Sequence, residues 1–107
     1  LKILFLSNNQ FNHVPKILAK LSLLSMIGMR NNKIKIFEEN ALPLSTRWLI
    51  LTDNELTSLP QSIGDLKLLQ KCMLSGNKLT SLPPRSGSIM ITGIPFLLAA
   101  SSPLLPA

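Results

Sequence analysis

The side chains that could carry out chemistry are few in this chain and lie far apart in its sequence. His13 is the only histidine and Cys72 the only cysteine, and the carboxylates are Glu38, Glu39, Asp53, Glu55 and Asp65. A nucleophilic dyad or a metal site needs several such groups brought together, and hydrolysis by paired carboxylates needs two of them facing each other across a cleft. The positions of these residues in the sequence indicate neither a dyad, nor a metal site, nor a pair of carboxylates across a cleft. We therefore predict no catalytic residue, no metal ligand and no cofactor, and a protein that is not an enzyme.

Asparagine is the one polar residue type that recurs at regular spacing. The intervals are 23, 22 and 23 residues, and the residues are Asn9, Asn32, Asn54 and Asn77. An asparagine side chain carries both donor and acceptor groups, so it can satisfy backbone groups that become buried where a chain turns inward. We therefore expect these residues to form a structural asparagine ladder.

The residues around each asparagine indicate the elements that hold it. The segments LKILFLSNNQF, LSMIGMRNNKI, TRWLILTDNEL and LQKCMLSGNKL follow the pattern L-x-x-L-x-L-x-x-N-x-L, which is the signature of a leucine-rich repeat. Positions 1, 4, 6, 11 and 14 are apolar in every repeat except at Thr46. Alternation around positions 3 to 7 predicts a short strand with one buried face, so parallel strands from successive repeats should lie side by side.

The predicted fold is an α/β-type solenoid of leucine-rich repeats, with short parallel strands on its concave face and irregular or helical segments on its convex face. Four repeats begin near residues 1, 24, 46 and 69 and fill residues 1–83. Proline follows position 14 in repeats 1, 3 and 4 and suits an extended return segment. Repeat 2 is one residue shorter and lacks this proline, so its return should take a different path. The pattern is already at position 1 at Leu1, and we expect the chain to be a fragment of a longer protein.

The unit LxxLxLxxNxLxxLPxxIGxL, met almost in full by residues 59–82 and their neighbours, resembles the intracellular class of leucine-rich repeats. That class includes the plant intracellular Ras-group-related proteins. The resemblance covers residues 1–83 and implies a non-catalytic signalling scaffold that binds a protein or peptide on its concave face. The stretches RWLILTDN and KLLQKCMLSGNKLTSLP are also similar to arrays attached to protein-kinase-like domains. The alternative is therefore a regulatory segment of a larger enzyme, such as a leucine-rich repeat protein kinase, with catalysis outside this chain.

The binding residues follow from the register of the repeats. If positions 4 and 6 point inward, positions 3, 5, 7 and 8 point outward, and positions 3 and 5 carry six large apolar side chains. Exposed apolar side chains that form a patch are typical of an interface. We expect Trp48 to be its energetic centre, with Arg30 and Lys71 as charged neighbours. The predicted binding face is Ile3, Phe5, Met26, Arg30, Trp48, Ile50, Lys71 and Met73. The other interpretation is that these side chains cover one another or meet a further domain of the same protein.

The formal net charge of +6 permits an anionic partner, but its distribution argues against nucleic acid. The basic residues are scattered over turns, the far side of the coil and the strands rather than gathered in a stripe, and the chain has no tyrosine for base stacking. A single cysteine excludes a disulfide within the chain and favours a reducing, cytoplasmic location. Cys72 occupies position 4, where a small buried hydrophobic side chain is expected.

The composition changes at Pro84. The remaining segment, residues 84–107, is an apolar tail with proline and serine that has no charge after Arg85 and no repeat asparagine. One interpretation is a degenerate fifth repeat with Ile91, Ile94 and Phe96 at positions 1, 4 and 6. The apolar run is too short for a clear membrane span, which needs about 20 residues. We favour an aberrant or alternative C-terminus, and the uncapped apolar ends favour self-association.

Overall fold

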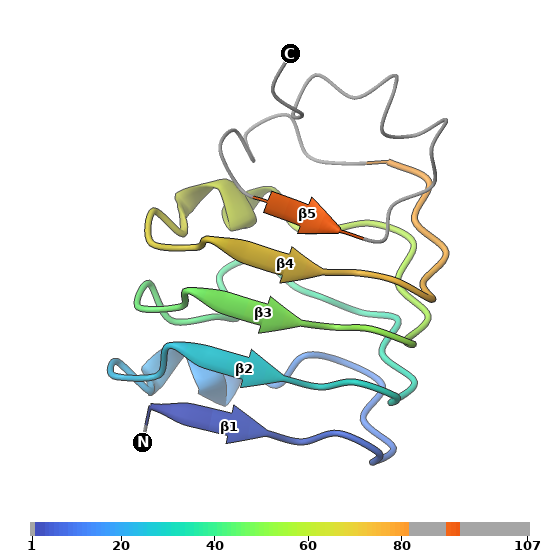
Figure 1. Cartoon of the computed structure of the whole chain (residues 1–107), viewed down its shortest axis with the longest axis horizontal. Coiled ribbons are helices and arrows are strands. Elements are labelled where there is room, and N and C mark those ends of the chain that lie inside the picture. The colour runs from blue at the N-terminus through green and yellow to red at the C-terminus, as the bar shows by residue number, and fades with distance from the viewer. Residues whose placement is uncertain (1, 82–89, 93–107) are drawn as a thin grey trace.

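Short parallel strands form a single sheet in this protein. The computed structural model describes residues 2–81 and 90–92. The strands are β1 (Ile3–Phe5), β2 (Met26–Gly28), β3 (Trp48–Ile50), β4 (Lys71–Met73) and β5 (Met90–Thr92). They lie side by side in chain order and all run in the same direction (Figure 1). From β1 to β4 each strand therefore belongs to one coil of the chain, and the rest of each of the first three coils carries the chain back to the start of the next strand.

The register of the sheet reproduces the spacing of the asparagines. Ile3 pairs with Met26, Met26 with Trp48, and Trp48 with Lys71, which are steps of 23, 22 and 23 residues. Because side chains alternate along a strand, equal positions of successive coils stack in rows on the same face of the sheet. The parallel sheet and its crossovers are consistent with the repeat fold expected from the sequence.

Strand β5 lies within the segment where the repeat pattern stops. Ile91 pairs with Cys72, and Met90 is 19 residues beyond its partner Lys71. Because Cys72 is at position 4 of its repeat, Ile91 is also at position 4 in the structure. The alignment that places Ile91 at position 1 of a fifth repeat would put the strand three residues later in the sequence. Ile94 and Phe96, and with them the expectations for the rest of the tail, lie outside the described residues.

The core lies on the inner side of the strands, and stacking of the coils determines how well each layer is buried. Leu24, Ile27 and Leu49 are fully buried between coils on both sides, whereas Leu4 and Leu6 of the first coil are only partly buried. The buried apolar residues are Val14, Leu18, Leu24, Ile27, Met29, Ile34, Ala41, Leu42, Leu49, Leu51, Leu56, Leu59, Ile63, Leu66, Leu69, Cys72, Leu74 and Leu79. Thr46, the one polar residue at an inward position, is also buried, and its hydroxyl donates a hydrogen bond to the carbonyl of Pro43 at 2.7 Å.

The return segments differ between coils. The first and third coils contain short 3-10 helices, η1 (Lys16–Lys20) and η2 (Gln61–Asp65), each directly after a proline. Leu18 and Ile63 point from these helices into the core. The second coil, one residue shorter, has turns in place of a helix over residues 38–45. The different path predicted for this repeat is confirmed.

Two adjacent glutamates link the second coil to both helices. The carboxylate of Glu39 accepts hydrogen bonds from the backbone N–H groups of Ser62 at 2.6 Å and Gln61 at 2.9 Å, in the first turn of η2. The bond from Ser62 is the main reason that the pKa of Glu39 is lowered from its ordinary value. Glu38 forms an ion pair with Lys16 of η1 at 2.9 Å. These side chains therefore join neighbouring coils.

Candidate functional site

The structure places all the predicted binding residues on one surface, which we call the outward face. It consists of positions 3, 5, 7 and 8 of the first four coils. Ile3, Phe5 and Trp48 are 51%, 58% and 39% exposed, and Met26, Ile50, Lys71 and Met73 are partly exposed. The pairing of the strands sets these side chains in two rows across the sheet, with Met26 between Ile3 and Trp48 in the first.

A shallow hollow of ≈ 480 Å³ crosses the outward face at positions 5 and 7. It is lined by Phe5, Ser7, Gly28, Arg30, Ile50, Thr52, Met73 and Ser75. Gly28 is buried beneath the ring of Phe5, and a Cβ atom at this position would meet that ring. The absence of a side chain at Gly28 thus lets Phe5 lie over the neighbouring strand.

Charged side chains flank the apolar rows. The Lys71 Nζ lies 5.2 Å from the centroid of the Trp48 ring, which is the geometry of a cation–π contact. At the other end of the strands, Arg30 Nε lies 3.7 Å from the Asp53 carboxylate, with both side chains exposed.

The asparagines beneath this face bind backbone groups of two coils. The Asn54 Nδ2 donates to the carbonyls of Leu51 at 3.0 Å and Thr52 at 3.3 Å in its own coil, and to the carbonyl of Met29 in the preceding coil at 2.9 Å. Its Oδ1 accepts from the Ile34 N–H of the preceding coil at 3.1 Å. Asn54 is only 5% exposed, so these bonds satisfy backbone groups that water does not reach.

The same contacts recur at the other inner coil boundaries. Asn32 donates to the carbonyl of Leu6 at 3.0 Å and accepts from the N–H of Phe11 at 3.2 Å. Asn77 forms the equivalent pair of bonds to the third coil. Asn9 differs, because it is exposed and donates only within its own coil, to Leu6 and Ser7. Asn32, Asn54 and Asn77 therefore each bind the backbone of the coil that precedes their own. We call this arrangement the asparagine clamp.

Position 8 has a conformational role that sequence reasoning missed. Its residues have positive φ angles: 60° at Asn8, 56° at Asn31, 59° at Asp53 and 74° at Gly76. Asparagine, aspartate and glycine are the residue types that tolerate this left-handed region best, so the column of residue types was the available signal. Here the chain leaves the strand and turns toward the position-9 asparagine.

Position 8 also makes one half of the outward face polar. A second hollow of ≈ 500 Å³ is lined by Ser7, Asn8, Arg30, Asn31 and Asp53. Asn31 Nδ2 donates to Asn8 Oδ1 across it at 2.8 Å. Because Ser7 and Arg30 line both hollows, the apolar and polar halves form one continuous surface.

Residues 1–21 match the family model described as Leucine Rich Repeat. This match supports a leucine-rich repeat, and repeats of this family are typically non-catalytic protein interaction modules. No curated protein and no solved structure matches the chain.

The side chains with potential chemistry lie apart in these repeats. His13 is on the first coil, where its Nδ1 is 2.8 Å from Asn12 Oδ1, and Cys72 is the central residue of β4, with its side chain buried in the core. Within residues 2–81 and 90–92, no three of the His, Cys, Asp and Glu side chains are close enough together to hold a metal ion. In the same part of the chain, no helix has the length and apolar character needed to cross a membrane.

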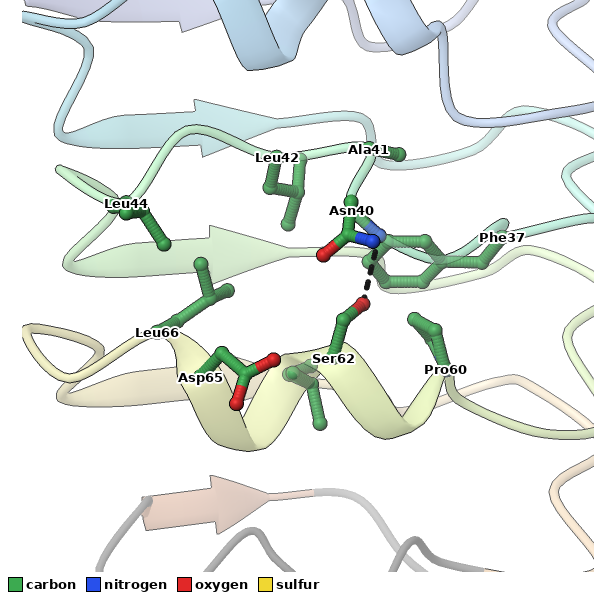
Figure 2. Close-up of a pocket in the computed structure, with 10 residues that line it drawn as sticks. Phe37, Asn40, Ala41, Leu42, Leu44, Pro60, Ser62, Asp65 and Leu66 are labelled. Carbon is green, nitrogen blue, oxygen red and sulfur yellow. Dashed lines mark hydrogen bonds between the residues drawn. The ribbon is translucent and has the colours of Figure 1, made fainter.

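A third, much smaller cavity lies on the side of the repeats away from the outward face. Figure 2 shows it between the return segment of the second coil and η2, with Asn40, Leu42 and Leu44 facing Ser62 and Leu66. Its volume is ≈ 20 Å³, which is space for about one water molecule. The Asn40 N–H donates to the Ser62 Oγ at 2.8 Å. This cavity lies at the contact between the second and third coils and is too small to bind a ligand.

Cys72 is expected to resist thiol reagents in the folded protein. Burial raises the pKa of its thiol to about 12. At pH 8 the thiolate is therefore about one part in ten thousand, and the core covers the sulfur. Colorimetric titration with a disulfide reagent should show negligible reaction over minutes at pH 8 and one equivalent after addition of denaturant. Rapid reaction before denaturation would show that this part of the core is open.

Proposed function

We propose that this chain is a protein recognition module and that its outward face binds a protein or peptide. The observation that carries this proposal is the exposure of Ile3, Phe5 and Trp48 together on one face of the sheet. Soluble proteins seldom leave such residues exposed in a contiguous patch unless the patch contacts something. Aromatic side chains at the centre and polar groups at the margin are typical of an interface.

The fixed positions of these side chains also support binding. The strands beneath the patch are held by the sheet and by the buried asparagines, and the Phe5 ring rests on Gly28. A surface whose side chains are already ordered loses less conformational entropy when a partner binds. In this proposal the coils stack as a solenoid, with the outward face on its concave side.

The proposed class is the intracellular type of leucine-rich repeat. Its LPxxIGxL segment corresponds here to residues 59–66, where Pro60 precedes η2 and Ile63 and Leu66 are buried. The motif thus accounts for the return segment of the third coil. We also propose that the protein is located in the cytoplasm.

Site-specific photocrosslinking tests where a partner binds. A photoreactive phenylalanine analogue at Phe5 should crosslink the binding partner in cells that produce the native protein. The matched control places the same analogue at Ile17, which is 60% exposed against 58% for Phe5 but lies in η1, on the other side of the core. Equal crosslinking from both positions, or crosslinking from Ile17 alone, would contradict binding on the outward face.

A further inference from the structure

Three of the basic residues lie where strands of the outward face begin. Lys2 directly precedes β1, Arg47 directly precedes β3, and Lys71 is the first residue of β4. Lys2 and Arg47 are exposed, and Lys71 is partly exposed over the Trp48 ring. Lys2 and Arg47 directly precede Ile3 and Trp48 of the first apolar row, and Lys71 ends that row beside Trp48. We call these three residues the basic margin.

The carboxylates of the described residues contact groups other than the basic margin or lie away from it. Ion pairs within the described residues join Lys16 to Glu38, Arg30 to Asp53, and Lys35 to Glu55, and none of them includes the basic margin. Glu39 binds the start of η2, and Asp65 belongs to that helix. Asp53 is the one carboxylate in the described part of the outward face, and its contact is with Arg30 at the opposite ends of the strands. The apolar rows are therefore bordered by positive charge without a neighbouring negative charge.

We infer that the partner segment is an acidic peptide with apolar anchors, bound across the strands of the outward face. This inference rests on the proposed function and specifies the chemistry of its partner. Adjacent strands are about 4.8 Å apart, so β1 to β4 span about 14 Å, which an extended peptide crosses in about five residues. Its apolar side chains contact the rows that contain Trp48 and Ile50. Its carboxylates face the basic margin, where complementary charge speeds association and selects against basic segments.

Synthetic peptides test the sign of this charge preference. The first probe is a peptide of about ten residues that alternates glutamate with phenylalanine and leucine. The second replaces every glutamate with lysine, and the third keeps the glutamates and replaces the apolar residues with serine. Trp48 is the only tryptophan, so its fluorescence reports on the outward face itself. We expect the first peptide alone to bind and to shift this emission, with an affinity that falls as salt is added.

Two double variants of equal net charge separate the basic margin from the overall charge of the protein. Lys2→Ser with Arg47→Ser should weaken binding of the first peptide by about tenfold or more. Lys33→Ser with Lys78→Ser, at exposed turn positions after the asparagines, should change it by less than about twofold. Equal weakening by the two pairs would contradict a role for the basic margin.

The outcomes distinguish this inference from the proposed function. Binding of the basic peptide as tightly as the acidic one, with a shift in Trp48 emission, would overturn the charge inference and leave recognition on the outward face standing. Binding of the acidic peptide without that shift would place it elsewhere and count against both. Failure of all three peptides to bind, or binding of anionic phospholipid vesicles in their place, would overturn the acidic peptide as partner.

Discussion

Replacing Asn54 with leucine should lower the free energy of unfolding by about 2 to 3 kcal/mol. The substitution removes the hydrogen bonds to the carbonyls of Leu51 and Met29 and the bond from the N–H of Ile34. These backbone groups then stay buried without partners, and leucine supplies neither a donor nor an acceptor. Because the bonds to Met29 and Ile34 join the second and third coils, unfolding should also become less cooperative.

The matched control for Asn54→Leu is Asn9→Leu, the same change at the same repeat position. Asn9 is exposed and bonds only to its own coil, so its loss should cost less than about 1 kcal/mol. Urea denaturation followed by Trp48 fluorescence and circular dichroism measures both variants. Similar destabilisation by the two substitutions would show that the contacts between coils do not determine the contribution of this asparagine.

Replacing Trp48 with alanine should weaken partner affinity by about 2 kcal/mol, or roughly thirtyfold. Trp48 lies in the middle of the first apolar row, between Met26 and Lys71, and removing its ring leaves a gap in the contact surface. Trp48 is 39% exposed and lies outside the buried core, so folding should change much less than binding. Titration calorimetry with the partner identified by crosslinking gives the affinity, and thermal unfolding gives the stability.

The matched control for Trp48→Ala is Ile17→Ala, which removes a more exposed apolar side chain from η1. This variant should bind the partner as tightly as the unsubstituted protein does. If Ile17→Ala weakened binding and Trp48→Ala did not, the partner would bind on the helix side of the coils and the outward face would not be the recognition surface.

The strands could be predicted from sequence because burial repeats with a fixed period. Position 4 is apolar in every coil, and its burial turns positions 3 and 5 outward, which places Phe5 and Trp48 on one surface. The sequence did not predict that the asparagine of the first coil makes no hydrogen bond to a neighbouring coil. Asn9 matches the pattern as well as Asn54 does, but its environment differs because no described coil precedes it.

Other features escaped prediction because they depend on contacts between coils or on backbone conformation. Glu39 shows no repeat pattern, and its role appears only when η2 of the next coil is placed beside it. The left-handed conformation at Asp53 and its equivalents leaves no trace in an apolar pattern, since it constrains φ rather than burial. A fifth strand followed only from the interpretation of the tail as a degenerate repeat, and β5 pairs with β4 three residues earlier than that alignment placed it.

Each asparagine of the clamp binds the coil before its own, and this direction makes one coil a unit that can be inserted or deleted as a whole. Asn77 binds the carbonyl of Leu51, and Asn54 binds that of Met29, so both recognise the same repeat position in the coil before them. Deleting residues 46–68 would therefore present Asn77 with Met29 in place of Leu51, and the clamp would close on an equivalent partner. Each duplication or loss of a coil would change the width of the outward face by one strand spacing, about 4.8 Å. Such a surface can match its length to a new partner during evolution without redesign of its core.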